Sequence, residues 1–281
     1  MPDWLDDYLK NCFEKVREKR PLVHHITNYV TVNDCANVTL ACGAAPVMAD
    51  DIGEVREIVN IASALVINIG TLNQRTIESM LAAGEAANQK GIPVILDPVG
   101  AGATSLRTRT ALRLIEEFKP TVIRGNISEI KAISGHGGKT RGVDADAGDS
   151  IDAGSLEPMK KLALEIAAKT GSIIAITGQT DLITDGKRIA LIKNGHPLMA
   201  QVTGTGCMCT SLIGSFCGAS EDFLAATAAA VMVMGLAGEL AFESVENHGL
   251  GCGSYRTLII DAISSMTSAQ LRKDGRIDFA G

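Results

Sequence analysis

Ala64-Leu65-Val66-Ile67-Asn68-Ile69-Gly70 is a continuous apolar run closed by a glycine. Its length is typical of a strand, and the lack of alternating polar residues predicts that both faces of this strand are buried. Strands of this kind occur in parallel sheets that helices cover above and below. The run therefore predicts an α/β protein.

Predicted strands and helices alternate on both sides of this run. Further strands are expected at 43–48, 93–98 and 121–125, with helices between them at 50–62, 73–90 and 105–118. Such alternation implies right-handed crossovers and a parallel sheet with helices on both faces. The segments 180–185 and 188–194 predict a hairpin, so the far edge of the sheet is expected to be antiparallel. We therefore expect three layers, α/β/α, around a mostly parallel sheet with an antiparallel edge.

The remaining segments extend this pattern without a boundary between domains. Helices are expected at 4–19, from a Thr27-Asn28 cap to Ala41, and at 206–218, 221–243 and 252–271. Residues 135–155 are rich in glycine and aspartate and predict a long surface loop, a pattern that lids share with disordered segments. No linker or internal repeat interrupts the chain, so residues 1–281 are predicted to form a single domain.

The composition disfavours several classes of protein. Hydrophobic residues make up 46% of the 281 residues and aromatic residues only 4%, so small aliphatic side chains must form the core. The net charge of −6 disfavours nucleic acid and anionic membranes as partners, although a local positive site could still bind a nucleotide. Seven cysteines without a CxxC pair disfavour a disulfide framework or a zinc site and favour a cytoplasmic protein. The apolar run Phe223–Gly238 is shorter than the roughly 20 residues of a membrane span and predicts a buried helix.

Polar residues mark the predicted carboxyl ends of the strands. Asn68, Asp97, Arg124 and Asn126 lie at or near these ends. Ligands of open α/β sheets bind outside the carboxyl ends of the strands. Polar side chains brought to one edge by separate strands therefore indicate a binding site there.

A glycine-rich turn precedes the helix expected at 206–218. Gly204-Thr205-Gly206 allows a tight turn, and the free N–H groups at the helix start favour a bound anion. Gly204, Thr205, Gly206 and Cys207 thus predict a cradle for a phosphate or a transition state, although an ordinary turn before a core helix explains the same pattern. Cys207 lies in the first helical turn, where its thiolate form is expected to be favoured.

Two carboxylates could serve Mg²⁺ at the strand ends. Asp97 precedes a flexible glycine loop and could bind the ion directly or through water, although an aspartate here can also cap a turn. Asn126 and Glu129 could hold the ion and its waters, but their spacing also fits a helix capping box. Arg124 would then supply the positive charge opposite phosphate.

The expected nucleotide and substrate contacts lie at other strand ends. Thr177-Gly178 follows an apolar strand and would face the nucleotide. Asn28 could hydrogen-bond a small substrate, and Met48 could form an apolar wall, although methionine is more often a core residue. His24 and His25 are adjacent in a predicted strand, so their side chains point to opposite faces and cannot bind one metal together.

Six segments resemble, in order and spacing, the hydroxyethylthiazole kinases, which are vitamin kinases with the ribokinase-like fold. They are Pro21–Val30, Ala45–Met48, Asp97–Gly100, Arg124–Glu129, Ile176–Gly178 and Val202–Cys207. The similarity extends over nearly the whole chain. It implies ATP-dependent phosphorylation of the primary alcohol of 4-methyl-5-(2-hydroxyethyl)thiazole in thiamine salvage. It also implies a requirement for Mg²⁺ and a homotrimer with active sites between the subunits.

The resemblance further implies residue roles at each part of the site. Met48, Gly204 and Asn28 are expected at the thiazole. The residues expected at ATP are Arg124, Thr177, Gly178 and Asn126. Asn126 and Glu129 match the NxxE motif that organises Mg²⁺ in this fold. Glu129 is therefore expected at the ion, together with Asp97.

Cys207 distinguishes branches of this resemblance. It stands where most ribokinase-like enzymes carry an aspartate base, and thiazole kinases characteristically carry cysteine there. Cys207 thus favours a thiazole kinase over a hydroxymethylpyrimidine or pyridoxal kinase, and it is expected to orient the alcohol or accept its proton. His25 and Cys209 depart from the family pattern and could alter substrate packing.

Two other classes of function remain open from the sequence. In a thiol enzyme, Cys207 would be a covalent nucleophile with a histidine base from elsewhere in the chain. A non-catalytic nucleotide-binding module would bind ATP without forming product, which the presence of Asp97, Asn126 and Glu129 disfavours.

Overall fold

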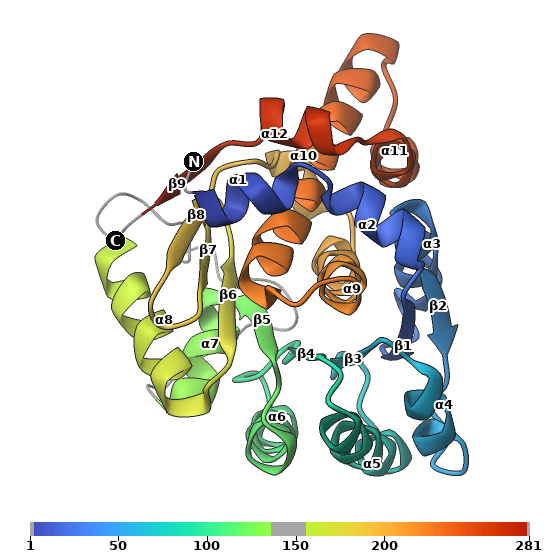
Figure 1. Cartoon of the computed structure of the whole chain (residues 1–281), viewed down its shortest axis with the longest axis vertical. Coiled ribbons are helices and arrows are strands. Elements are labelled where there is room, and N and C mark those ends of the chain that lie inside the picture. The colour runs from blue at the N-terminus through green and yellow to red at the C-terminus, as the bar shows by residue number, and fades with distance from the viewer. Residues whose placement is uncertain (1–2, 136–155, 280–281) are drawn as a thin grey trace.

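The computed structural model describes residues 3–135 and 156–279 (Figure 1). The loop predicted at 135–155 lies outside the described residues except for Gly135. Within the described part of the chain, nine strands form one sheet in the order β2-β1-β3-β4-β5-β6-β7-β8-β9. Their bounds are β1 Leu22–Ile26, β2 Ala45–Met48, β3 Ala64–Asn68, β4 Val94–Asp97, β5 Val122–Asn126, β6 Ile173–Thr177, β7 Asp181–Thr184, β8 Ile189–Ile192 and β9 Ile277–Phe279.

The strand directions confirm the predicted sheet. Strands β1 to β6 pair in parallel, whereas β7, β8 and β9 pair antiparallel at one edge. All five residues of β3 are buried, as their unbroken apolar run predicts. The short strand β9 is not expected from the sequence pattern.

Helices cover both faces of the sheet (Figure 1). The helices α4 to α8 pack on one face around a core that includes Ile67, Leu96 and Phe118. The other face is covered by α1, α2, α3 and α9 to α12, around a core that includes Val66, Leu212 and Phe216. The fold is therefore the predicted three-layer α/β/α arrangement.

The helices have the following bounds: α1 Asp3–Leu9, α2 Cys12–Lys19, α3 Val32–Ala41, α4 Val55–Ile61, α5 Gln74–Lys90, α6 Ser105–Phe118, α7 Ile127–Ser134, α8 Leu156–Thr170, α9 Thr205–Gly218, α10 Phe223–His248, α11 Cys252–Ser265 and α12 Ser268–Asp274. A short 3-10 helix covers Pro197–Gln201.

Several predicted helix boundaries are wrong. The helix expected at 4–19 is interrupted between Leu9 and Cys12. The helix expected after Thr27-Asn28 begins only at Val32, because the Asn28 side chain accepts hydrogen bonds from Thr31 and holds a turn. The helix expected at 252–271 is two helices, since Met266 is extended and Thr267 caps α12.

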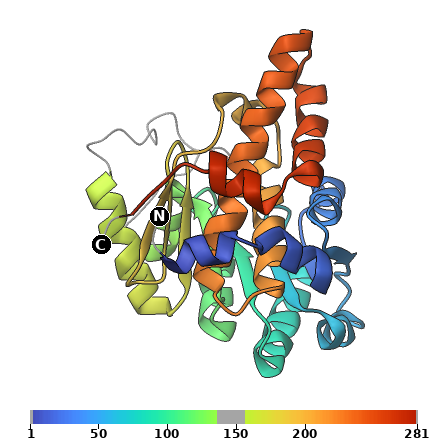
Figure 2. The same ribbon diagram turned by 45° about the horizontal axis from the view of Figure 1, so that its top comes forward.

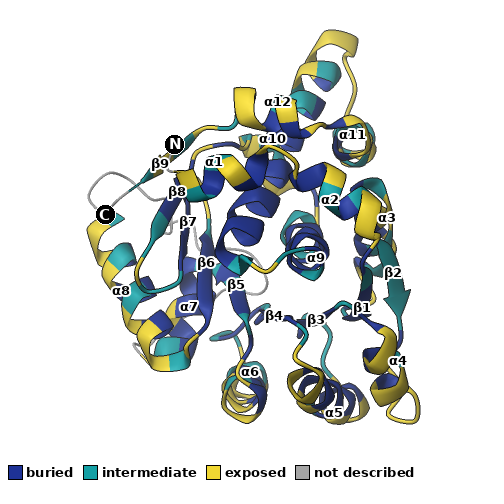
Figure 3. Cartoon of the chain, in the orientation of Figure 1, coloured by how far each residue is buried: buried dark blue, intermediate teal, exposed yellow. Residues whose placement is uncertain are grey.

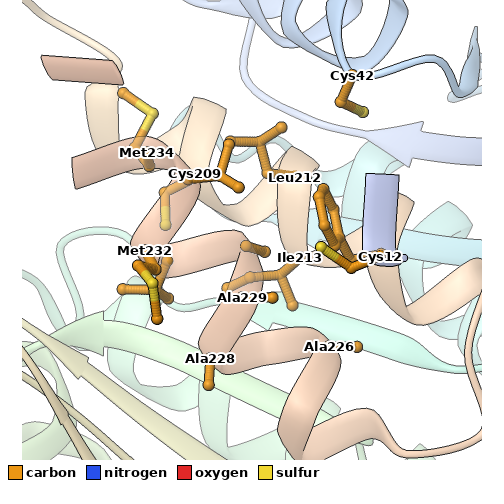
Figure 4. Close-up of a cluster of buried hydrophobic side chains, with 14 of the residues drawn as sticks. Cys12, Cys42, Cys209, Leu212, Ile213, Ala226, Ala228, Ala229, Met232 and Met234 are labelled. Atoms are coloured by element: carbon orange, nitrogen blue, oxygen red, sulfur yellow. The ribbon is translucent and has the colours of Figure 1, made fainter. Parts of the chain in front are cut away.

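Helices α9 and α10 form the centre of the second core. Figure 3 shows α9 and the first part of α10 mostly buried, whereas the carboxy-terminal end of α10 is exposed. Figure 4 shows the small and sulfur-containing side chains of this core, among them Cys209, Ala229 and Met232. Among the described residues, α10 alone is long and apolar enough to span a membrane, but 83% of its most apolar window is buried in the protein. The prediction of a buried helix at Phe223–Gly238 is therefore confirmed.

The beginning and the end of the described chain pack together. The Trp4 ring of α1 meets the Phe279 ring of β9 edge to face, with 6.0 Å between centroids. Arg272 of α12 forms an ion pair with Asp6 of α1 at 2.7 Å. Leu5 and Leu9 of α1 are fully buried. Figure 2 shows α1 lying across α10 beneath the segment that leads into β9.

Candidate active site

The strand register gathers the predicted polar residues at one edge of the sheet. Asn68 at the end of β3 lies opposite Asp97 at the end of β4, and Asn126 at the end of β5 lies opposite Thr177 at the end of β6. The amino terminus of α9, which contains Thr205, Gly206 and Cys207, contacts this same edge through hydrogen bonds from two asparagines. The predicted meeting of strand-end residues is therefore confirmed.

Two buried asparagine amides converge on Cys207. Asn28 Nδ2 and Asn68 Nδ2 each lie 3.3 Å from Cys207 Sγ, and Asn28 Nδ2 also donates to Asn68 Oδ1 at 3.1 Å. Asn28 itself is fixed by the Thr31 N–H and hydroxyl, which both donate to its Oδ1. The sulfur thus occupies one defined position beside polar donors.

Asp97 is the central acidic group of the site and is fully buried. Its Oδ2 accepts hydrogen bonds from Asn68 Nδ2 at 3.0 Å and Thr210 Oγ1 at 2.8 Å, and Arg124 Nη1 lies 3.7 Å away. Its Oδ1 has no hydrogen-bond partner among the described residues. Burial raises the pKa of this carboxyl, while the Arg124 charge and the two hydrogen bonds lower it.

Glu129 and Asn126 form the capping box of α7. Asn126 Oδ1 accepts from the Glu129 N–H, while Glu129 Oε2 accepts from the Asn126 N–H, each at 2.8 Å. Glu129 Oε1 also accepts from the Gly100 N–H at 2.8 Å. The capping interpretation is therefore confirmed. Burial and the nearby Asp97 charge raise the pKa of Glu129 to about 7.

Both glycines of the turn before α9 are required by close neighbours. Gly204 has φ +89°, and a Cβ on it would lie 2.4 Å from the Thr31 methyl group. A Cβ on Gly206 would lie 2.5 Å from Arg124 Nη1. Arg124 also donates to the Thr177 hydroxyl. The turn therefore brings backbone, guanidinium and hydroxyl donors to one place, where they can bind an anion.

The predicted thiolate at Cys207 is wrong. Burial raises the pKa of this thiol, and the negative charge of Asp97 raises it further. Hydrogen bonds with Thr31 and Asn28 and the Arg124 charge lower this pKa, but the net shift is upward. At neutral pH Cys207 is therefore a neutral thiol. Among the described residues, no histidine hydrogen-bonds to it, so the thiol-enzyme hypothesis has no base.

Met48, His24 and His25 lie on the β2 side of this edge. Met48 ends the edge strand β2 and is partly exposed. His24 Nε2 pairs with the Ala49 carbonyl at 2.8 Å, and His25 Nδ1 pairs with the Val23 carbonyl at 3.0 Å. Burial lowers the pKa of His25 to about 4, so its ring is neutral at pH 7.

The residues present fit a magnesium ion that is held by one carboxylate together with water and substrate phosphates. Within the described residues, no group of three or more His, Cys, Asp or Glu side chains is placed to hold a metal. Mg²⁺, however, keeps several waters and needs one or two carboxylates together with substrate phosphates. The unpaired Oδ1 of Asp97 fits such a ligand. Glu129 fits less well as a direct ligand because both of its oxygens already accept backbone hydrogen bonds.

Asp181 is a buried acid that the sequence pattern does not single out. It accepts a hydrogen bond from the Gly178 N–H at 2.9 Å and so fixes the turn after β6. Burial raises its pKa from the ordinary 3.8 to about 7, although this hydrogen bond and the Arg124 charge oppose the shift. The acid thus supports the backbone beside Thr177.

We expect the Asp181→Asn variant to gain stability relative to the unsubstituted protein as pH rises from 4 to 7. Between these values the folded protein retains a proton that the unfolded chain releases, so ionisation favours unfolding by up to about 1.4 kcal/mol per pH unit. Asparagine keeps the acceptor for Gly178 but cannot ionise. Urea unfolding of both proteins at several pH values measures the difference, and parallel stability curves would contradict the prediction.

Comparisons with known proteins agree with this arrangement. The model of the hydroxyethylthiazole kinase family matches residues 13–269. A hydroxyethylthiazole kinase of Clostridium tetani is 52% identical over 95% of this chain and 96% of its own length. Another, from Ruminiclostridium cellulolyticum, is 53% identical over 98% of this chain and 99% of its own length.

Solved structures show the same fold. The hydroxyethylthiazole kinase protein of Pyrococcus horikoshii OT3 superposes with a TM-score of 0.87 at 37% identity, covering 98% of this chain and 100% of that one. A pyridoxal kinase of Staphylococcus aureus shares only the ribokinase-like fold, with a TM-score of 0.55 at 16% identity over 76% of this chain and 86% of that one. On its sequence, its fold and the arrangement of its strand-end residues, this chain belongs to the hydroxyethylthiazole kinase family.

Proposed function

We propose that the protein transfers the γ-phosphoryl group of ATP to the primary alcohol of 4-methyl-5-(2-hydroxyethyl)thiazole, a step of thiamine salvage. The observation that most supports this is the convergence of Asn28, Asn68 and Cys207 beside Asp97 and the Gly204–Gly206 turn. This arrangement combines a cluster of small polar side chains with a place for a transferred anion. Family membership supports the thiazole alcohol as the acceptor.

The transfer proceeds by in-line displacement, in which positioning and charge stabilisation supply most of the catalysis. The substrate hydroxyl lies near Cys207 and attacks the γ-phosphorus while the bond to the ADP oxygen breaks. The N–H groups of Thr205, Gly206 and Cys207 stabilise charge on the phosphoryl oxygens. Arg124 neutralises part of the same charge, and the hydroxyl proton passes to an oxygen of the transferred phosphoryl group, so that the products are ADP and the thiazole phosphate.

The substrates divide between two sides of this turn. Arg124, Asn126, Thr177 and Gly178 form the nucleotide side, where the guanidinium and the Thr177 hydroxyl are already paired. On the thiazole side, Asn28 supplies a polar contact, Gly204 lies against the ring, and Met48 provides an apolar wall at the edge strand. Asp97 and Glu129 would hold Mg²⁺, Asp97 through its free oxygen and Glu129 through water. When bound, this ion neutralises phosphate charge and orients the nucleotide.

The neutral Cys207 thiol serves to orient the alcohol, and we expect Cys207→Ser to keep at least about a tenth of kcat. Serine retains a small polar group that Asn28 and Asn68 can contact, so the alcohol stays oriented. If Cys207 were instead the general base, its replacement would remove a contribution of roughly 10²–10⁴-fold to the rate. Steady-state kinetics at saturating ATP and thiazole alcohol measures this ratio. A loss of more than about a hundredfold without a loss of folding would instead assign the proton-accepting role to Cys207.

Each subunit is a single kinase domain that spans residues 1–281. Three such subunits form a homotrimer, which is located in the cytoplasm. Exposed apolar residues support an interface on the β2 side of the sheet: Tyr29 and Val30 are 78% and 58% exposed and directly follow Asn28. Leu40, Ile52 and Ile61 are exposed on neighbouring segments. A subunit placed there would close the thiazole side of the site. Light scattering of the purified protein tests the trimer, and a monomer at micromolar concentration would overturn it.

A coupled assay of ADP release tests the activity itself. The thiazole alcohol is supplied with ATP, with and without Mg²⁺, and hydroxymethylpyrimidine and pyridoxal are supplied in parallel. We expect release that depends on Mg²⁺ and on the thiazole alcohol, with much slower turnover of the other alcohols. Folded protein that releases no ADP with the thiazole alcohol would refute the proposed function, and preference for pyridoxal or hydroxymethylpyrimidine would replace its substrate.

A further inference from the structure

Arg107 lies in the first turn of α6, outside the group of residues described above. Its Nη1 donates to the Ile69 carbonyl at 3.1 Å and the Val99 carbonyl at 2.7 Å, and its Nη2 donates to the Gly70 carbonyl at 2.7 Å. The side chain is partly buried. One guanidinium therefore joins the loop after β3 to the loop after β4.

The placement of this charge is unfavourable by itself. The positive end of the α6 dipole lies at the same helix turn, where a cation is destabilised. All three acceptors are carbonyls, so within the described part of the chain no carboxylate neutralises the guanidinium. Arg109, two residues further along α6, is exposed to solvent. The three hydrogen bonds to carbonyls offset this cost, and they also fix the spacing of the two loops.

Each of the joined loops donates a backbone N–H to a side chain of the active site. Gly70 N–H donates to Asn68 Oδ1 at 2.9 Å, and Asn68 in turn contacts Asp97 and Cys207. Gly100 N–H donates to Glu129 Oε1 at 2.8 Å. The guanidinium thus binds the carbonyl of Gly70, whose own N–H donates to Asn68. It also binds the Val99 carbonyl, which shares a peptide unit with the Gly100 N–H that donates to Glu129.

We propose that Arg107 is a positioning residue for phosphoryl transfer, which holds the loops after β3 and β4 at the spacing that aligns Asn68 and Glu129. The inference rests on the proposed kinase activity. The planar fork of arginine suits this task, because its fixed N–H directions reach three carbonyls at once, whereas a lysine ammonium is a compact point charge on a flexible stem.

The test compares Arg107→Ala, Arg107→Lys and the matched surface variant Arg109→Ala. We expect kcat to fall roughly 10- to 100-fold in Arg107→Ala, because small displacements of catalytic groups have effects of this size. The KM for the thiazole alcohol should change less than about threefold, since Arg107 is placed to act on loop geometry rather than on that substrate. Arg107→Lys should lie between these values, and Arg109→Ala should match the unsubstituted enzyme.

Two further readouts separate positioning from general stability. Guanidinium ions added at a non-denaturing concentration should partly restore kcat in Arg107→Ala but not change Arg109→Ala. Hydrogen exchange should be faster at the Gly70 and Gly100 amides in Arg107→Ala, while the strands β3 and β4 keep their protection. An unchanged kcat, or loss of protection throughout the protein without rescue, would overturn the proposal. The exchange measurement needs no turnover, so it remains decisive for the loops even where the kinase activity itself is refuted.

Discussion

Asp97→Asn is expected to lower kcat for the thiazole alcohol by roughly a hundred- to a thousandfold, the range found when one preorganised electrostatic group of an active site is removed. The amide keeps the size of the side chain and can still accept a hydrogen bond from Thr210. It removes the charge that balances Arg124 at 3.7 Å, and the free carboxylate oxygen proposed for Mg²⁺. Steady-state kinetics over a range of Mg²⁺ concentrations measures the loss.

Asp34→Asn provides the matched control for this experiment. Asp34 is also buried and lies 3.6 Å from an arginine, Arg256, but on the outer helices α3 and α11. We expect its kcat to stay within about twofold of the unsubstituted enzyme, the ordinary result for a site without contact to the reacting groups. If Asp97→Asn retained more than a tenth of the activity, the central electrostatic role of Asp97 would be wrong.

Gly204→Ala is expected to reduce kcat about a hundredfold, because a misplacement of roughly 1 Å at a catalytic turn has an effect of this size. Alanine at φ +89° is strained, and its Cβ would lie 2.4 Å from the Thr31 methyl carbon. The turn must therefore move away from Thr31, and the N–H groups of Thr205 and Gly206 move with it. Kinetics and thermal unfolding together measure the change.

The double variant Thr31→Ser with Gly204→Ala isolates the steric cause. Serine keeps the hydroxyl that donates to Asn28 but lacks the methyl group that meets the new Cβ. We expect it to restore part of the lost activity, with a coupling of about 1 kcal/mol in a double-mutant cycle. Gly253→Ala serves as the control, since nothing lies within 4 Å of a Cβ there. Strictly additive effects would show that the Thr31 contact is not the cause.

The central sheet could be predicted because its signal is local. The apolar run of β3 and the alternation around it require no knowledge of distant residues, and the observed strands follow them. Strand β9 has only three residues, and its place depends on distant partners: Arg276 donates to Lys193 O and to Glu239. Contacts of that kind have no periodicity in the sequence, so this strand could not be foreseen.

The sequence predicted most of the residues that meet at the site, but it did not predict all of their contacts or the direction of the pKa shift of Cys207. Parallel strands bring their ends together, so Asp97, Arg124 and Asn126 could be grouped from the order of residues along the chain. The contacts of Thr210 with Asp97 and of Arg107 with Ile69 depend on the register of segments far apart in the sequence, and so does the burial of Asp181. The Cys207 prediction failed for a different reason: the effect of a helix start is visible in sequence, whereas burial and the approach of Asp97 are not.

The packing of α1 against β9 has a consequence for synthesis of the protein. Helix α1 leaves the ribosome long before β9 exists, by roughly 13 to 55 seconds at synthesis rates of 5–20 residues per second. Until Phe279 emerges, Trp4 lacks its aromatic partner, and Leu5 and Leu9 lack part of the surface that buries them. We therefore expect α1 to reach its final packing only after β9 has been synthesised.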